Sequence, residues 1–206
     1  MRIESMQWYS ARTCVAALGL LCASAGAPWG LGVAGTLEPG GELPTQEVFS
    51  SSGADMTPGD RHRHALAQCF IDAGQRFGVD PYLLLSIKYV ETGNSLDPAI
   101  TGRNKNGTID MGLMQINSIW LKNAFIRAAG IKKNHLYDPC ININVGAWIL
   151  SQEIGRHGVH EGIGRYHSAT PKFKNAYRVK VLAQYSRLAK RRAEAQAKKS
   201  VVASAE

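Results

Sequence analysis

The sequence predicts a mainly α-helical domain that carries one small hairpin, and two observations lead to this prediction. Apolar residues recur at helical spacing between residues 61 and about 188, in runs that begin at capping residues. Between two of these runs lies Asn106-Gly107, a pair that favours a tight turn between two strands. The chain has 206 residues, which is enough for one compact domain and additional segments.

The first two expected helices lie between residues 61 and 93. The first is marked by an apolar stripe with steps of four, three and four residues, formed by Leu66, Phe70, Ala73 and Phe77. Asp80 suits an N-cap and Pro81 suits the first helical position, so the second helix is expected to begin there. Gly93 is expected to end it as a C-terminal glycine.

Two further helices are expected in the second half of the domain. Asp138 and Pro139 repeat the cap-and-proline signal, and Gly155 is expected to end the helix that begins there. Thr170 and Pro171 begin the last helix. Its expected apolar stripe consists of Phe173, Tyr177, Val181 and Leu188.

The N-terminus has the pattern of an export signal. Arg12 precedes an apolar run over residues 13–27 that contains an Ala-Ser-Ala cleavage site. We therefore expect residues 1–25 to be a signal peptide, with a short buried helix as the alternative. Both Met1 and Met6 stay open as translation starts.

The segments on either side of the expected domain, residues 61–188, differ from it in composition. Residues 26–60 hold eight glycines and four prolines, which indicates a flexible leader. From Arg187 onward there are six Lys or Arg against two Glu, so residues 189–206 form a basic tail. A frayed, solvated helix end is expected there, and contact with a wall or a partner is the alternative.

The net charge of +8 indicates a polyanionic partner, such as nucleic acid, anionic lipid or bacterial cell wall. Nucleic acid is disfavoured because the basic residues cluster in the tail instead of alternating with aromatic residues. No internal apolar run reaches the length of a membrane span, so no integral anchor is expected. Neither a metal nor a cofactor is expected, because no carboxylate or cysteine set accompanies the paired histidines His62, His64, His157 and His160.

The cysteines divide into two pairs. Cys14 and Cys22 leave with the export signal, so Cys69 and Cys140 remain in the mature chain. In an exported protein this pair predicts one disulfide, which would contribute about 4 kcal/mol by closing a long loop. Two buried free thiols are the alternative.

Glu91 stands at the end of an apolar helical run, between Val90 and Gly93. The C-terminal end of a helix carries partial negative charge, and an apolar setting desolvates a carboxylate. Both effects favour the protonated acid at neutral pH, the form that general acid catalysis requires. The alternative is a surface charge at a helix terminus.

The stretch "DMGLMQINSIW" places amides and a hydroxyl among apolar residues. The amides of Gln115 and Asn117 can bind sugar hydroxyl and acetamido groups, while Met114 can cover C–H surfaces. The alternative is a core helix followed by an Asn-Ser cap that starts another helix at Ile119.

The order of motifs adds a resemblance. "ETGN", "DPAI", "NGTIDMGLMQINS", "NVGAWIL" and "GIGRYHSA" occur in sequence between residues 66 and 185, nearly the whole expected domain. This order resembles the soluble lytic transglycosylase family, and most closely its small members that accompany conjugation, type III and type IV secretion and pilus machines. The resemblance implies a lysozyme-like α+β domain, with the small hairpin beside the active-site helix.

The resemblance also implies roles for individual residues. Glu91 matches the catalytic acid of the family. The implied substrate-binding positions are Thr92, Met114, Gln115, Asn117, Tyr166 and His167. Thr92 replaces the usual Ser and keeps the hydroxyl, whereas His167 replaces an Asn, which places one sugar contact in doubt and makes His167 itself a candidate contact. Secretion-associated members share the cysteine pair, which supports a bridge between Cys69 and Cys140.

The implied reaction cleaves the β-1,4 bond between N-acetylmuramic acid and N-acetylglucosamine in peptidoglycan strands. In the implied reaction Glu91 acts alone and a 1,6-anhydromuramic end results. Asp97 and Asp110 are the candidates for a second carboxylate, but Asp97 precedes Pro98 in a turn and Asp110 could cap a helix, so a structural role is expected for each. The implied setting is the periplasm of a Gram-negative bacterium, with components of a secretion, conjugation or pilus machine as candidate partners. A lysozyme-type muramidase that uses water, or a catalytically weak wall-binding assembly factor, remains the alternative.

Overall fold

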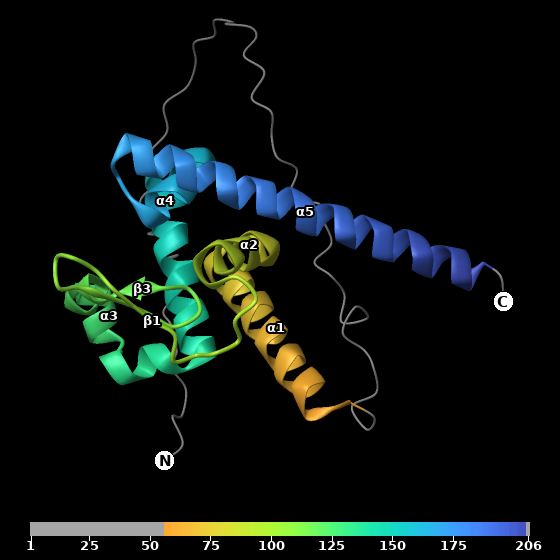
Figure 1. Cartoon of the computed structure of the whole chain (residues 1–206), viewed down its shortest axis with the longest axis horizontal. Coiled ribbons are helices and arrows are strands. Elements are labelled where there is room, and N and C mark those ends of the chain that lie inside the picture. Colours follow the sequence, from red (N-terminus) through yellow and green to blue (C-terminus); the bar gives the residue numbers. More distant parts are fainter. Residues whose placement is uncertain (1–55, 205–206) are drawn as a thin grey trace, which may run out of the picture. The chain divides into compact units, whose positions relative to one another are not determined.

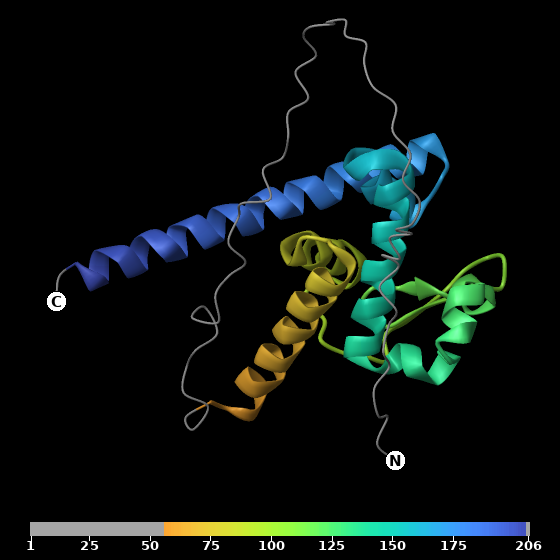
Figure 2. The same cartoon turned by 180° about the vertical axis from the view of Figure 1, so that it is seen from behind.

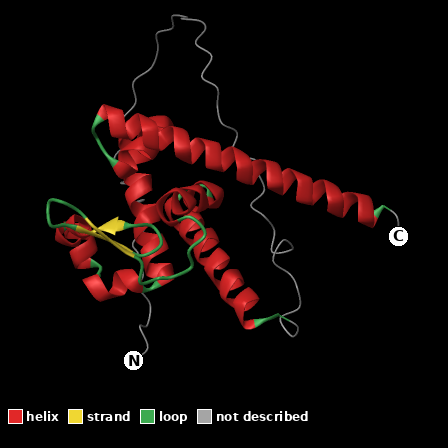
Figure 3. Cartoon of the chain, viewed as in Figure 1, coloured by secondary structure: helices red, strands yellow, loops and turns green. Residues whose placement is uncertain are grey.

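The computed structural model describes residues 56–204, so the expected signal peptide and most of the expected leader lie outside the described residues. Helices dominate the described part, and a small antiparallel sheet accompanies them (Figures 1 and 3). The elements in chain order are α1 Pro58–Phe77, α2 Pro81–Thr92, β1 Thr101–Arg103, β2 Ile109–Met111, β3 Ile116–Asn117, η2 Ser118–Lys122, α3 Ala124–Ala128, η3 Lys133–Tyr137, α4 Pro139–His167 and α5 Pro171–Ala203.

Helix α2 begins and ends at the residues that the sequence predicts, whereas α1 begins earlier than expected. The Asp80 carboxylate accepts a hydrogen bond from the Tyr82 N–H at 2.8 Å and caps α2, while Gly93 ends it with a φ of 59°. Helix α1 begins at Pro58, before the expected boundary at residue 61, because the Thr57 side chain caps it.

The hairpin predicted around Asn106-Gly107 is confirmed. Strands β1 and β2 pair antiparallel, and Gly107 in the connecting turn has a φ of 81°. Strand β3 adds a third, unexpected strand, which brings Asn117 opposite Asp110. Figures 1 and 2 show the sheet on one side of the first part of α4, with α1 and α2 on the other.

Helix α4 begins at Asp138 and Pro139 as predicted, but the expectation that it ends at Gly155 is wrong. The break lies at Gly158, where φ is 77° and ψ is 165°. Beyond it the chain folds back so closely that a Cβ on Gly162 would lie 2.6 Å from the backbone nitrogen of Ile154. The Arg165 Nε atom forms an ion pair with the Glu153 Oε2 atom at 2.9 Å, and this contact links the two parts of α4 before and after the break.

Helix α5 packs on α4 and α2 through Tyr177, Val181 and Leu188, which are buried as the stripe predicts. Phe173 belongs to the same predicted stripe but is 54% exposed, because it lies outside the packed interface. The helix continues through the basic tail to Ala203 (Figure 2). Between residues 56 and 204, no helix is both long and apolar enough to cross a membrane.

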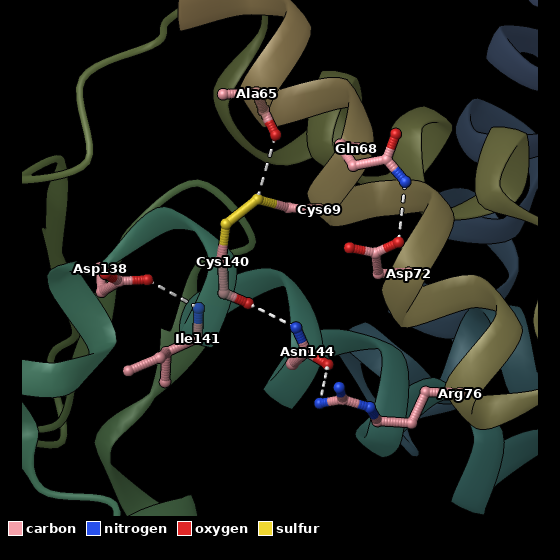
Figure 4. The surroundings of a disulfide bond; sticks show 9 residues. All are labelled: Ala65, Gln68, Cys69, Asp72, Arg76, Asp138, Cys140, Ile141 and Asn144. Atoms are coloured by element: carbon pink, nitrogen blue, oxygen red, sulfur yellow. Dashed lines mark hydrogen bonds between the residues drawn. A yellow bond between two sulfur atoms is a disulfide. The ribbon is translucent and has the colours of Figure 1, made fainter. Parts of the chain in front are cut away.

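A disulfide joins Cys69 of α1 to Cys140 at the start of α4, with the two Cα atoms 5.1 Å apart (Figure 4). One α4 turn further on, Arg76 of α1 donates a hydrogen bond to the Asn144 side chain at 3.0 Å. Asn144 in turn donates to the Cys140 carbonyl at 2.8 Å. The contact between α1 and α4 is therefore fixed by a covalent link and by a polar link beside it.

Candidate active site

Glu91 lies in the last turn of α2 and faces a cleft of about 720 Å³. The other walls come from the hairpin between residues 104 and 110, from the stretch 115–120, and from residues 165–169 at the end of α4. The two parts of α4 and the sheet thus bring three distant segments of the chain to one acid.

One hydrogen bond fixes the Glu91 carboxyl. The hydroxyl of Tyr177 on α5 donates to the Glu91 Oε1 atom at 2.6 Å, and Tyr177 is only 5% exposed. The sequence indicated Tyr177 as part of an apolar stripe and not as a site residue. A signal was present, because a buried tyrosine hydroxyl usually finds a hydrogen-bond partner.

The environment raises the pKa of Glu91 to about 7, mainly through burial. The Tyr177 hydrogen bond opposes this shift because it stabilises the ionised carboxylate, and the negative charge of Asp110 adds to the shift. An acid with this pKa is substantially protonated at neutral pH, and it can also accept a proton back.

The turn after Glu91 is held by two side chains of α2. The buried Lys88 ammonium donates to the Gly93 carbonyl at 2.8 Å, and burial lowers its pKa. The Thr92 hydroxyl lies 2.9 Å from the Leu113 carbonyl and 3.1 Å from the Lys88 carbonyl. Thr92 therefore ties α2 to the loop around Leu113, and it is not among the residues that line the cleft.

The loop between β2 and β3 is tightly constrained. Gly112 has a φ of 70°, and a Cβ there would lie 2.7 Å from the Leu136 carbonyl oxygen. The buried Asn142 amide accepts from the Met114 N–H at 2.7 Å and donates to the Met111 carbonyl at 2.9 Å. Gln115 follows with a φ of 47°, unusual for a residue other than glycine, and this loop presents it to the cleft.

Tyr166 and His167 lie on the part of α4 that follows the break at Gly158, and both line the cleft together with Glu91. The Tyr166 hydroxyl donates to the Met114 carbonyl at 2.9 Å, and burial raises its pKa well above the ordinary value. The His167 ring stacks on Tyr177 with centroids 4.7 Å apart. Burial first, and then the charge of Lys180, lowers the pKa of His167 and favours a neutral ring.

Asp110 is held between two amides. The side chain of Asn117 donates to its Oδ1 atom at 2.7 Å, and that of Asn104 donates to its Oδ2 atom at 2.8 Å. Asp110 lies in β2, so the expectation that it caps a helix is wrong, although the carboxylate does line the cleft. Asp97 instead accepts from the Ala99 N–H at 2.9 Å in a turn, as expected.

The expected site residues therefore divide into two groups. Five line the cleft, namely Glu91, Gln115, Asn117, Tyr166 and His167. Met114 does not line the cleft, because its side chain is fully buried. Thr92 does not line it either, and its hydroxyl donates to a backbone carbonyl instead. The sequence did not identify Tyr177, which donates a hydrogen bond to Glu91. It also did not identify Trp120 and Arg165, which line the cleft. Within residues 56–204, no three side chains of His, Cys, Asp or Glu gather as a metal site.

A buried acid in a cleft between helices and a small sheet defines a lysozyme-like glycan-cleaving domain. A family model described as the transglycosylase SLT domain matches residues 68–197. The chain belongs to this family, and it is a peptidoglycan lytic transglycosylase.

Three curated proteins are similar to this chain. "Invasion protein IagB" of Salmonella typhi is 35% identical over 145 residues, which cover 68% of this chain and 88% of the relative. "Protein IpgF" of Shigella flexneri is 30% identical over 116 residues, covering 55% and 74%. "X polypeptide" of Escherichia coli is 35% identical over 104 residues, covering 50% and 59%.

Proposed function

We propose that this protein cleaves the β-1,4 bond between N-acetylmuramic acid and N-acetylglucosamine and leaves 1,6-anhydromuramic ends. The observation that carries the proposal is the Glu91 carboxyl, whose pKa of about 7 suits both halves of a proton exchange. A second carboxylate is not needed for this reaction, and both oxygens of Asp110 already accept amide hydrogen bonds.

In the first step, protonated Glu91 donates its proton to the glycosidic oxygen. Positive charge then develops at the anomeric carbon of the muramic residue, and the 2-acetamido group of the substrate stabilises it. The Tyr177 hydroxyl keeps Glu91 in one orientation, and its hydrogen bond becomes stronger as the carboxylate forms.

In the second step, the Glu91 carboxylate accepts the proton of the C6 hydroxyl of the same muramic residue. The C6 oxygen attacks the anomeric carbon, and an intramolecular attack benefits from proximity. The acid is restored, and no water is consumed. The pKa of His167 is lowered, so the ring that stacks on Tyr177 is favoured in its neutral form and adds no positive charge of its own beside Glu91.

The cleft supplies glycan contacts of two kinds. Gln115, Tyr166 and His167 lie on its walls and are proposed to contact the sugars directly. The Asn117 amide donates to Thr108 and Asp110, so its role is to order the polar wall. Met114 and Thr92 do not line the cleft. They hold the loop that presents Gln115, because the Met114 carbonyl accepts from Tyr166 and the Thr92 hydroxyl donates to the Leu113 carbonyl.

We further propose that the enzyme opens the wall locally for a secretion, conjugation or pilus apparatus. The similarity covers 88% of the length of the relative named "Invasion protein IagB", and this supports a specialised role. The proposal includes export to the periplasm of a Gram-negative bacterium with a signal peptide over residues 1–25. A leader over 26–60, a catalytic domain over 61–188 and a basic tail over 189–206 would then remain.

Muropeptide analysis tests the reaction. Purified protein should release anhydro ends from isolated cell wall, and Glu91→Gln should lose nearly all activity, because a positioned proton donor contributes roughly 10²–10⁴ in rate. Glu194→Gln, a change of an exposed glutamate on α5, is the matched control. Wall clearance by Glu91→Gln at the wild-type rate would show that another group is the acid.

The same experiment distinguishes the proposed reaction from the hydrolytic alternative. Asp110 lines the cleft together with Glu91, which is the observation that favours a muramidase with two carboxylates. A hydrolase releases reducing ends, which are heavier than anhydro ends by one water. Anhydro ends from the wild type therefore support the single-acid reaction, and reducing ends contradict it.

A further inference from the structure

A second, smaller cavity of about 190 Å³ lies next to the catalytic acid. It is lined by Val90 and Glu91 of α2, by His167, and by one face of α5, and we call it the α5 cavity. Glu91 and His167 line both this cavity and the main cleft, so the acid stands where the two meet. A glycan cut at Glu91 has a part on each side of the cut bond.

The face of α5 in this cavity consists of Phe173, Ala176, Tyr177 and Lys180. These residues have helical spacing, so they share one side of the helix. Tyr177 is buried and binds Glu91, whereas Phe173 is 54% exposed. An exposed aromatic ring beside the acid adds little to the core, but it suits the apolar face of a sugar.

Lys180 supplies the charge of the cavity. On the same helix, Lys174 and Arg178 both pair with Glu161, but no carboxylate in residues 56–204 forms an ion pair with Lys180. The Lys180 charge is felt by His167, whose pKa it helps to lower, which agrees with its place in the cavity. The α5 cavity thus combines an aromatic wall with one uncompensated positive charge.

We propose that the α5 cavity receives the part of the glycan beyond the cut bond and that Lys180 binds a carboxylate on it. This inference rests on the proposed function. Peptidoglycan carries such carboxylates in two places, on the peptides attached to muramic residues and on the lactyl group where a peptide has been removed. Phe173 then covers the sugar face while Lys180 distinguishes muramic strands from uncharged glycans.

The test compares Lys180→Gln with Lys172→Gln, which changes an exposed lysine of α5 that lines neither cavity. Three substrates are needed: strands with peptides, strands from which an amidase has removed the peptides, and peptide-bearing strands whose carboxylates have been converted to amides. We expect Lys180→Gln to lower kcat/KM roughly three- to fivefold on a carboxylate-bearing strand, mainly through KM, as for an exposed ion pair. Lys172→Gln should match the wild type.

The substrates distinguish the two sources of the carboxylate. A loss on peptide-bearing strands alone assigns Lys180 to the peptide, and a larger loss after amidase treatment assigns it to the lactyl group. On amidated strands Lys180→Gln and the wild type should be equal, and Lys180→Arg should keep most activity on all three. Equal behaviour of the two Gln variants everywhere, or a loss that persists on amidated strands, overturns the proposal.

Binding of the same strands to the inactive Glu91→Gln protein, with and without Lys180→Gln, separates this inference from the proposed reaction. If the wild type releases reducing ends, the proposed reaction fails while the binding comparison still reports on Lys180. If anhydro ends form and Lys180→Gln binds as tightly as its Glu91→Gln parent, the inference alone fails.

Discussion

At the end of α2, burial and a hydrogen bond act on the Glu91 carboxyl in opposite directions. Burial disfavours the charge and raises the pKa, and the Tyr177 hydroxyl favours the charge and lowers it. The balance leaves a pKa of about 7, so neither the donor nor the acceptor form is excluded at neutral pH. We therefore propose that Tyr177 is a positioning residue that also sets the working pH of the acid.

Tyr177→Phe tests this role. The lost hydrogen bond should lower kcat roughly tenfold, because about 1.4 kcal/mol separates a positioned from a free carboxyl. The pKa of Glu91 should rise above about 7, so the alkaline fall of kcat/KM should move to higher pH. The measurement is a pH–rate profile on isolated cell wall.

Tyr185→Phe is the matched control for that variant. The Tyr185 hydroxyl, also on α5, donates to Asp80 at 2.5 Å and is separate from Glu91. Its loss should leave the pH profile in place. If Tyr177→Phe kept the wild-type profile as well, the hydrogen bond would have no part in setting the acid.

The raised pKa of Glu91 also predicts a cost in stability. The ordinary value is 4.5 and the folded value is about 7, so the folded state disfavours the charged form. The contribution of Glu91 to stability is fully present below pH 4.5 and is lost as the pH rises through 7. Glu91→Gln stays neutral and should be more stable than the wild type at pH 8 by about 2–3 kcal/mol.

Urea unfolding at pH 5 and pH 8 measures this difference. The gain from Glu91→Gln should be small at pH 5, and Glu194→Gln should show no such trend. A gain of equal size at both values would mean that the Glu91 charge is not what destabilises the fold.

The residues of the site differ in how far the sequence could predict them. The position of Glu91 follows from its own helix, because the apolar run and the glycine after it are local signals. Tyr177 lies 86 positions away and becomes a site residue only when α5 packs on α2. Met114 was expected to face the glycan, but its buried side chain follows from the loop geometry at Gly112 and Gln115.

Among the elements, α4 does most to assemble the site, because its break reverses the chain. The sequence correctly predicts its start, since Asp138 caps it through the Ile141 N–H at 2.9 Å. It does not distinguish Gly155 from Gly158 as the break, because both are glycines in one polar stretch. The choice depends on the packing of Gly162 against Ile154, which only the folded chain contains.

Gly158→Ala and Gly155→Ala form a matched pair for this element. An added Cβ meets nothing within 4 Å at either position, so the two variants differ only in backbone conformation. Gly158 has a φ of 77°, so alanine there should cost about 1–3 kcal/mol of stability. Gly155 keeps helical geometry, so alanine there should add about 0.5–1 kcal/mol.

Thermal unfolding gives both values, and wall cleavage gives the effect on the site. Gly158→Ala should also reduce activity, because Tyr166 and His167 follow the break. Equal stability of the two variants would mean that the break at Gly158 is not a constraint on the fold.

At the scale of the whole molecule, the proposed catalytic residues and the covalent link lie at different places. Glu91, Tyr177 and His167 meet where α2, α5 and the end of α4 come together. The disulfide joins α1 to the start of α4, and the Arg76–Asn144 hydrogen bond lies beside it (Figure 4). The bridge should therefore contribute to the stability of the domain more than to the geometry of the acid.

The double variant Cys69→Ala/Cys140→Ala tests that separation. The bridge closes a loop with a sequence separation of 71, so its removal should lower the free energy of unfolding by about 4 kcal/mol. Activity per folded molecule at 25 °C should stay near that of the wild type, because the Arg76–Asn144 contact still aligns α1 with α4. Reductant should destabilise the wild type in urea and leave the double variant unchanged. A double variant as stable as the wild type would show that the helix contacts alone hold α1 in place, and a loss of activity in the folded variant would show that the bridge also positions the acid.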